Sequence, residues 1–293
     1  MSRQPAVETF FHEPTFTATH VAWCTDTGKA AIVDSVRDFC HRSGRLTDDS
    51  AAEVAAFVRS NGLTVERILE THAHADHLSA APWLKQALGG RIGIGRGIVD
   101  VQHAFADVFD SGPDGGPDGD PDGAQFDDLF GDGARFGLGN LAVEVLHTPG
   151  HTPACVSYSI GDAVFVGDTI FMPDYGSARC DFPGGDARTL YRSVHRLFGL
   201  PDETRVFLCH DYKAPGRDAF VWQTTIGEER QRNIHIREGV DEDSFVEMRM
   251  NRDRTLDMPL LIIPSIQVNM RAGHMPPAES NGTIYLKVPL NRL

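Results

Sequence analysis

The fold can be inferred from ETHAHADHLSA, residues 70–80, which crowds three histidines and an aspartate into six consecutive positions. The four residues are His72, His74, Asp76 and His77. Imidazole and carboxylate side chains need partners when they are buried and gain little from clustering on a surface. Their spacing therefore indicates a shared bound object, and a metal ion is the object that best suits this mixture of groups.

Around this cluster the sequence predicts strands and helices in alternation. Residues 65–71 predict a strand that ends at the cluster, and residues 77–90 predict a helix. Upstream, residues 19–35 predict a hairpin that turns at a Thr-Gly pair. The stretch RIGIGRG, residues 91–97, lacks the G-x-G-x-x-G spacing of a dinucleotide-binding loop and predicts a short strand instead.

The helix predicted over residues 47–63 has its own start and stop signals. Ser50 and Glu53 have the spacing of a capping box, and Asn61 and Gly62 would end the helix. We therefore expect the hydroxyl of Ser50 to cap the first turn.

The second half of the chain predicts more strands. Short apolar runs bounded by turn residues fill residues 134–171, and residues 205–211 predict one more strand. Between them, residues 186–201 predict a helix capped by Asp186. Strands thus occur in two blocks with helices interspersed, which predicts an α+β fold of αββα type, with two sheets packed face to face and helices on the outer faces.

The segment DSGPDGGPDGDPDGAQFDD, residues 110–128, is rich in Gly, Pro and Asp and cannot bury a core, so it predicts an exposed insertion. Asp118, Asp120 and Asp122 match the first half of an EF-hand loop. The position of the closing glutamate is Leu129, which favours a flexible acidic loop over a calcium site.

Further candidate ligands stand just beyond predicted strands. His151, Asp168 and His210 each follow a different strand, and a rigid sheet brings such strand ends together. Asp34 also follows a strand, where it either shapes a turn or orients the histidine loop. We expect His147 to be structural. Isolated histidines, which are usually surface residues, predict no role in the site: His12, His20, His41 and His103.

Composition excludes several functional classes. The 293 residues are 41% hydrophobic and suit one large domain or a domain with a small appendage. A net charge of -14 argues against nucleic-acid binding, and no apolar run is long enough to span a membrane. Five scattered cysteines without a C-x-x-C pair predict neither disulfides nor a structural zinc site. We expect a soluble, unprocessed cytoplasmic protein in a reducing compartment.

The motifs THAHADH, TPGHTPAC, VFVGDTIF and CHDY, in this order and spacing, resemble the metal motifs of the metallo-β-lactamase superfamily over roughly residues 15–235. The resemblance implies a catalytic domain over residues 1–240, with residues 241–293 as a C-terminal extension packed on it. The same scaffold supports both hydrolases and oxidoreductases, so two reactions stay open.

The hydrolase alternative is similar to glyoxalase II and would use two zinc ions to activate a water that attacks a thioester. The resemblance implies that one ion is held by His72, His74 and His151 and the other by Asp76, His77 and His210. Asp168 would bridge the two ions.

The favoured alternative is similar to the persulfide dioxygenases, which take part in sulfide oxidation. That resemblance implies one Fe(II) per chain held by His72, His151 and Asp168, with the other motif residues (His74, Asp76, His77 and His210) nearby but without a second metal. The substrates would be glutathione persulfide, or a similar small persulfide, and O2, giving sulfite and the thiol.

Residues 176–214 favour this branch. They resemble persulfide dioxygenases and include RCDFPGG where glyoxalase II usually carries a GRFFEG-like stretch, and the tail beyond residue 240 has too many prolines and β-branched residues for a long helical substrate domain. By the resemblance Arg179 would contact glutathione, unless it pairs with Asp181, and Tyr212 would hydrogen-bond near the sulfur.

The acidic insertion and the C-terminal extension distinguish the chain from shorter, mitochondrial-type persulfide dioxygenases and resemble a longer bacterial subgroup. We expect no nucleic-acid or membrane partner. Relatives of this kind commonly form homodimers.

Overall fold

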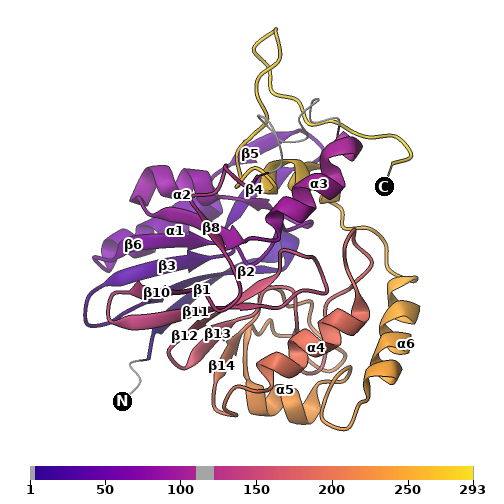
Figure 1. Cartoon of the computed structure of the whole chain (residues 1–293). Coiled ribbons are helices and arrows are strands. Elements are labelled where there is room, and N and C mark those ends of the chain that lie inside the picture. Colours follow the sequence, from indigo (N-terminus) through magenta and orange to yellow (C-terminus); the bar gives the residue numbers. More distant parts are fainter. Residues whose placement is uncertain (1–3, 110–121, 293) are drawn as a thin grey trace.

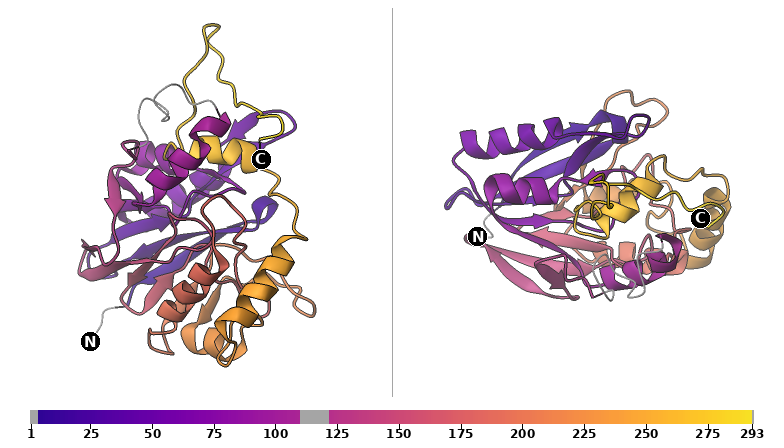
Figure 2. Two further views of the ribbon diagram at one scale, coloured as in Figure 1. Left: turned by 45° about the vertical axis from the view of Figure 1, so that its right-hand side comes forward. Right: turned by 90° about the horizontal axis from the view of Figure 1, so that it is seen from above.

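The computed structural model describes residues 4–109 and 122–292. Two six-stranded sheets pack face to face, with α1 and α2 on one outer face and α4 and α5 on the other (Figures 1 and 2). The predicted αββα architecture is confirmed. The first sheet has the order β1 (Ala6–His12), β2 (Thr17–Trp23), β3 (Lys29–Val33), β6 (Thr64–Leu69), β8 (Arg91–Gly95) and β9 (Asp128–Phe130).

The second sheet has the order β10 (Arg135–Leu138), β11 (Leu141–His147), β12 (Val156–Ile160), β13 (Ala163–Phe165), β14 (Arg205–Phe207) and β15 (Gln223–Thr225). A small third sheet contains β5 (Arg45–Thr47), β4 (Val36–Cys40) and β7 (Leu78–Ser79). The helices are α1 (Asp49–Ser60), α2 (Ala81–Leu88), α3 (Ile98–Phe109), α4 (Ala187–Leu197), α5 (Ile226–Arg232), α6 (Glu242–Asp253) and α7 (Ile262–Asn269), with a short 3-10 turn, η1, at Glu13–Thr15.

Three apolar layers hold the sandwich together. Between the sheets, side chains such as Val33 and Leu69 pack against Tyr158 and Phe165. The other two layers lie under the outer helices. Each fully buried aliphatic side chain contributes about 1.5–3 kcal/mol relative to an exposed one. Strand β3 is buried on both faces after its first residue, which explains its continuous apolar run AAIV.

The outer helices follow from local sequence, with one exception. In α4 the carboxylate of Asp186 accepts the amide of Thr189 at 2.7 Å, which confirms the predicted cap. The capping box predicted for α1 is wrong: the helix starts at Asp49, and Ser50 donates its amide (2.9 Å) and its hydroxyl (2.8 Å) to Asp38 of β4. A neighbouring strand therefore supplies the acceptor that the local motif would have supplied.

The strand directions bring the predicted ligands to one edge. β3 and β6 run parallel, as do β13 and β14, while β11 and β13 each run antiparallel to β12. Asp34 and the histidine loop therefore follow neighbouring strands of one sheet, and the segments after β11, β13 and β14 follow strands of the other. An isolated bridge between Thr17 and His210 joins the two sheets at this edge.

The segment after residue 240 packs on the rest of the chain through two helices for which the sequence showed no signal. It contains two helices: α6 packs on α4, where the rings of Phe245 and Tyr191 lie 5.7 Å apart, and α7 packs against the core beside α3 (Figures 1 and 2). The prolines at positions 259 and 264 stand just before α7 and in its first turn, where a missing amide is tolerated. The proline content of the tail is therefore not an argument against helices there.

Of the insertion predicted over residues 110–128, the structure describes residues 122–128. Residues 110–121, and with them Asp118 and Asp120, lie outside the described residues. Phe126 is buried, and Asp128 already belongs to β9. Among the described residues, no helix combines the length and apolar character needed to cross a membrane.

Candidate metal centre

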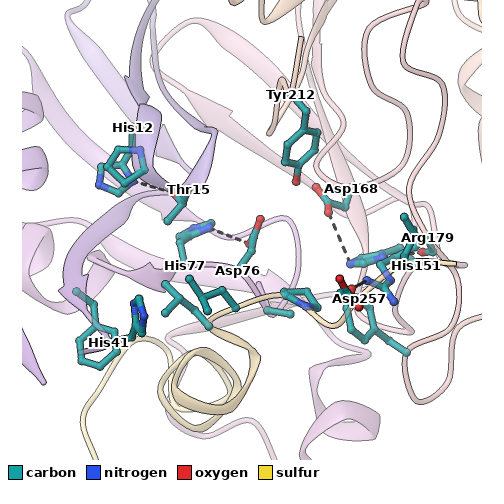
Figure 3. Close-up of a pocket in the computed structure, with 18 of the residues that line it drawn as sticks. His12, Thr15, His41, Asp76, His77, His151, Asp168, Arg179, Tyr212 and Asp257 are labelled. Carbon is teal, nitrogen blue, oxygen red and sulfur yellow. Dashed lines mark hydrogen bonds and ion pairs between the residues drawn. The ribbon is translucent and has the colours of Figure 1, made fainter. Parts of the chain in front are cut away.

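The structure brings the predicted ligands together in two adjacent groups. Side-chain donor atoms of His72, His151 and Asp168 lie within 4.8 Å of one another. Ligand atoms of a second group lie equally close together: His74, Asp76, His77 and His210. Figure 3 shows members of both groups at the wall of one cavity. Residues from four separate strand ends therefore meet at one point.

Each histidine is oriented by a contact at one ring nitrogen. Nδ1 of His151 lies 2.8 Å from the carbonyl oxygen of Arg179, so it carries the proton and leaves Nε2 facing the centre. Nδ1 of His210 contacts the carbonyl of Phe16 at 3.2 Å, and Nε2 of His74 contacts Asp34 at 3.0 Å. Metal-binding histidines typically have such a partner behind the ligating nitrogen.

Several other side-chain atoms of these groups lack hydrogen-bond partners among the described residues. Within the described part of the chain, the buried atoms without one include Nδ1 of His74, Nε2 of His77, Nε2 of His210 and Oδ1 of Asp168. An unpaired buried polar atom is costly and calls for an explanation. A bound cation would satisfy these atoms together, so the residues fit a metal ion.

Asp34 orients the histidine loop, which was one of the two roles expected for it. Its carboxylate accepts the amide of Thr71 at 2.7 Å and the hydroxyl of Thr71 at 2.9 Å, in addition to its contact with His74. Its φ of 53° is unusual for a residue other than glycine, a cost that functional sites often carry.

Glu70 is a site residue that the motif spacing did not predict. It lies 3.1 Å from Nε2 of His74, and Ser79 donates to it at 2.7 Å. Burial lowers the pKa of His74, but Asp34 and Glu70 outweigh it and hold that pKa well above the usual value. Glu70 is the first residue of ETHAHADHLSA, and this position next to the predicted metal ligands is the sequence signal that could have identified it.

Two other histidines of the centre, His72 and His77, are kept neutral. Burial, followed by the neighbouring His74 and His151, holds the pKa of His72 well below its usual value. Burial and His74 lower the pKa of His77 to about 4, although Asp76 acts against them. A neutral imidazole is the form that binds a metal.

Asp168 lies between the two groups. One carboxylate oxygen is 3.4 Å from Nε2 of His210, and the other is 3.7 Å from Nε2 of His151. Burial raises the pKa of this carboxyl group, and the two histidines act against that rise. The geometry could therefore hold one ion in the first group or two ions bridged by Asp168.

The second group also makes contacts within itself. Asp76 reaches Nδ1 of His77 at 3.2 Å with one oxygen and Nε2 of His210 at 3.0 Å with the other. The contact to His210 is an ion-pair distance without hydrogen-bond alignment. Burial alone would raise the pKa of Asp76, but His210 and His77 outweigh it and lower that pKa.

A cavity of about 700 Å³ opens beside the centre. Its wall combines the metal groups with aromatic residues, the β4–β5 hairpin and residues 256–261 of the C-terminal segment. This size and mixture suit a small organic ligand with polar ends. His12 and His41, for which no role was expected, line it as well, whereas His20 is buried and hydrogen-bonded to the carbonyl of Leu208 at 2.9 Å.

The two predicted substrate-binding residues both line this cavity. Arg179 pairs with Asp181 through two contacts of 2.6 and 2.7 Å and donates to the carbonyl of Asp257 at 2.7 Å. The ion pair with Asp181, which was the alternative to a contact with glutathione, is therefore formed. Tyr212 points its hydroxyl toward Asp168 (Figure 3). Burial, then the nearby Asp76 and Asp168, raise the pKa of Tyr212 well above its usual value, so it can donate a hydrogen bond. His147 contacts the carbonyl of Pro153 at 3.0 Å and does not belong to either metal group.

Comparisons with known proteins agree on the family and diverge on the reaction. Residues 10–210 match the model of the metallo-beta-lactamase superfamily. A probable metallo-hydrolase of Burkholderia pseudomallei is 50% identical over 98% of this chain and 99% of its own length. Glyoxylase B2 of Dictyostelium discoideum is 46% identical over 100% of this chain and 99% of its own length.

More distant relatives carry another name. The mitochondrial persulfide dioxygenase ETHE1 of Mus musculus is 28% identical over 91% of this chain and 88% of its own length. The crystal structure of ETHE1 from Myxococcus xanthus superposes with a TM-score of 0.72 at 28% identity, covering 92% of this chain and 100% of that one.

Proposed function

The chain belongs to the metallo-β-lactamase superfamily, and from that premise we propose that it is an iron-dependent persulfide dioxygenase. In the proposed reaction a persulfide, O2 and water give a thiol, sulfite and two protons. The persulfide loses four electrons and O2 gains them, so no further reductant is needed. Glutathione persulfide or a similar small persulfide is the proposed substrate.

The observation that carries this proposal is the ligand set of the first group, His72, His151 and Asp168. In the first group the closest ion-pair contact is 3.7 Å, between His151 and Asp168, and no hydrogen bond joins its three members among the described residues. Two histidines and one carboxylate form the ligand set of non-haem iron oxygenases. This ligand set supports an iron ion held by His72, His151 and Asp168.

An iron(II) ion in that set would supply the redox chemistry that O2-dependent oxidation of sulfur requires. The chain's own residues have three tasks. The carbonyl of Arg179 fixes the tautomer of His151. The hydroxyl of Tyr212 is available as a hydrogen-bond donor beside Asp168, where a sulfur anion would lie. The aromatic wall of the cavity, including Phe171 and Phe182, limits access of water to the reacting sulfur.

The relatives named persulfide dioxygenase and ETHE1 support the proposal over nine-tenths of the chain, although at 28% identity. We further propose that the protein acts in the cytoplasm on a small molecule, without a nucleic-acid partner, and that it can form a homodimer. Residues 1–240 and 241–293 would act as one catalytic unit.

A two-zinc thioester hydrolase of glyoxalase II type is the second candidate. Two observations favour it. Every ligand of a dinuclear site is present, with Asp168 between the groups, and two relatives at 50% and 46% identity are named metallo-hydrolase and glyoxylase. A role in metal storage or sensing is weaker, because such a role needs no 700 Å³ cavity beside the ligands.

One preparation separates the two reactions. The full chain is purified anaerobically, its metal content is measured, and O2 uptake and sulfite release are followed after glutathione persulfide is added. The proposal expects about one iron per chain and O2 uptake in a 1:1 ratio with sulfite. Two zinc ions per chain, with thioester cleavage and no O2 uptake, would refute it in favour of the hydrolase.

A further inference from the structure

The side chain of Asn269, at the end of α7, contacts the histidine loop directly. Its Nδ2 donates to the carbonyl of His74 at 2.8 Å and to the carbonyl of His77 at 2.7 Å. Its Oδ1 accepts the amide of Ser79 at 2.8 Å. The residue is only 4% exposed, so these three hydrogen bonds are shielded from water. They join positions about 190 residues apart in the sequence.

These bonds replace a backbone support that the loop lacks. Residues 72–77 belong to no helix or strand, and in the described ranges no backbone amide donates to the carbonyl of His74 or His77. A primary amide offers two donors and one acceptor oxygen, and here all three functions are used. The loop that carries His74, Asp76 and His77 is therefore held at both ends by one side chain.

The rest of α7 packs under the same loop. Ala73 and Ala75 alternate with the ligands, and both belong to the apolar core that also includes Ile266 and Met270. The alternation thus separates a ligand face from a packing face. The end of α7 is itself fixed, because Gln102 of α3 donates to the carbonyl of Met270 at 2.8 Å.

We propose that Asn269 is a positioning residue of the metal centre: its amide sets the backbone of the loop, and through it the directions of His74, Asp76 and His77. The C-terminal segment is then part of the metal centre as well as a cover of the fold. The same loop, residues 72–77, also carries His72, which is a ligand in both reactions considered above, so the inference applies to either one.

The chain provides a matched control two residues away. Gln267 is also an amide on α7 and is also 4% exposed, but it donates to the carbonyls of Ile263 (2.8 Å) and Lys287 (2.9 Å) and accepts the amide of Lys287 at 2.8 Å. It makes three comparable bonds without touching the loop. Asn269→Asp and Gln267→Glu each replace two donors with a carboxylate of nearly the same shape.

The test measures Co(II) binding to the metal-free full chain by competition with a coloured chelator, and the visible spectrum of the Co(II)-loaded protein. Asn269→Asp should weaken Co(II) binding about 10-fold or more and shift the Co(II) absorption bands, since supports of ligating residues typically affect affinity by that factor. Gln267→Glu should lower the thermal midpoint while it leaves Co(II) affinity within about 2-fold.

Equal weakening in both variants, or unchanged Co(II) affinity and spectrum in Asn269→Asp, would overturn the inference. If Asn269→Asp is not recovered folded, Asn269→Ala carries the same expectation against Gln267→Ala, because it removes the same donors without adding a charge. Failure of the dioxygenase assay would leave this result unaffected, since Co(II) binding is measured without substrate.

Discussion

Replacing Gly167 by alanine should disturb the metal centre from behind. Gly167 precedes Asp168 and has a φ of +52°. A β-carbon there would lie 2.3 Å from the hydroxyl oxygen of Thr71 and 2.6 Å from its Cβ. Thr71 cannot keep its place at those distances, and its hydroxyl is the one that donates to Asp34 at 2.9 Å. The substitution therefore displaces Thr71, which supports the histidine loop, and strains the backbone next to the ligand Asp168.

The magnitude has two parts. An alanine in the left-handed region costs about 1–2 kcal/mol. Losing the buried hydrogen bond from Thr71 to the Asp34 carboxylate costs about 1–3 kcal/mol more. We expect the free energy of unfolding of the metal-free protein to fall by about 2–5 kcal/mol in total.

Gly133→Ala supplies the matched control, because Gly133 has a φ of +70° and a β-carbon there would meet nothing within 4 Å. Urea unfolding should give only the backbone cost, about 1–2 kcal/mol, for this variant. Co(II) affinity should fall about 10-fold in Gly167→Ala and stay unchanged in Gly133→Ala. Equal losses of stability in the two variants, together with equal Co(II) affinities, would refute the reasoning about Thr71.

Three other perturbations test the ligand assignment and the electrostatics. Asp168→Ala should lose more than about 10-fold in iron affinity, whereas His210→Ala should retain iron if only one ion is bound. Iron analysis after gel filtration measures both, and loss of iron from both variants would contradict a mononuclear site. In the metal-free protein Asp34 and Glu70 raise the pKa of His74 despite burial. Protonated His74 therefore stabilises the fold fully below its unfolded-state pKa of about 6.5, and this contribution is lost as pH rises through its pKa in the folded protein. Asp34→Asn should flatten that fall, measured by urea unfolding between about pH 6 and 9, and an unchanged slope would contradict the pairing. Tyr212→Phe should lower kcat for persulfide oxidation with little change in KM if its hydroxyl acts on the reacting sulfur, and steady-state O2 uptake distinguishes this from a loss of binding.

Patterns with a local cause were predictable from the sequence. The αββα layering followed from runs of apolar residues, and the cap of α4 followed from Asp186 and its neighbour three positions on. The convergence of His151, Asp168 and His210 on the histidine loop followed from their positions after strands. Each of these depends on periodicity or spacing within a few residues, where short-range geometry is set by the backbone.

Other predictions failed where a distant residue competes with a local one. Asp38 of β4 takes the place of the capping box expected at Ser50. The tail, for which no helix was predicted, contains α6 and α7, which are stabilised by packing against α4 and the core. In the first turn of a helix a proline carries little penalty.

The sequence by itself determined the family, the layered architecture and the identity of the candidate ligands, since these are written in spacings of a few residues. Only the tertiary structure decided how the ligands are oriented and divided. It put Asp34 and Glu70 behind His74, paired Asp76 with His77 and His210, and brought Asn269 under the loop from the far end of the chain. Hydrogen bonds act over about 3 Å between atoms whose separation along the chain can be any number of residues, so no local pattern encodes contacts such as those of Asp34, His210 and Asn269.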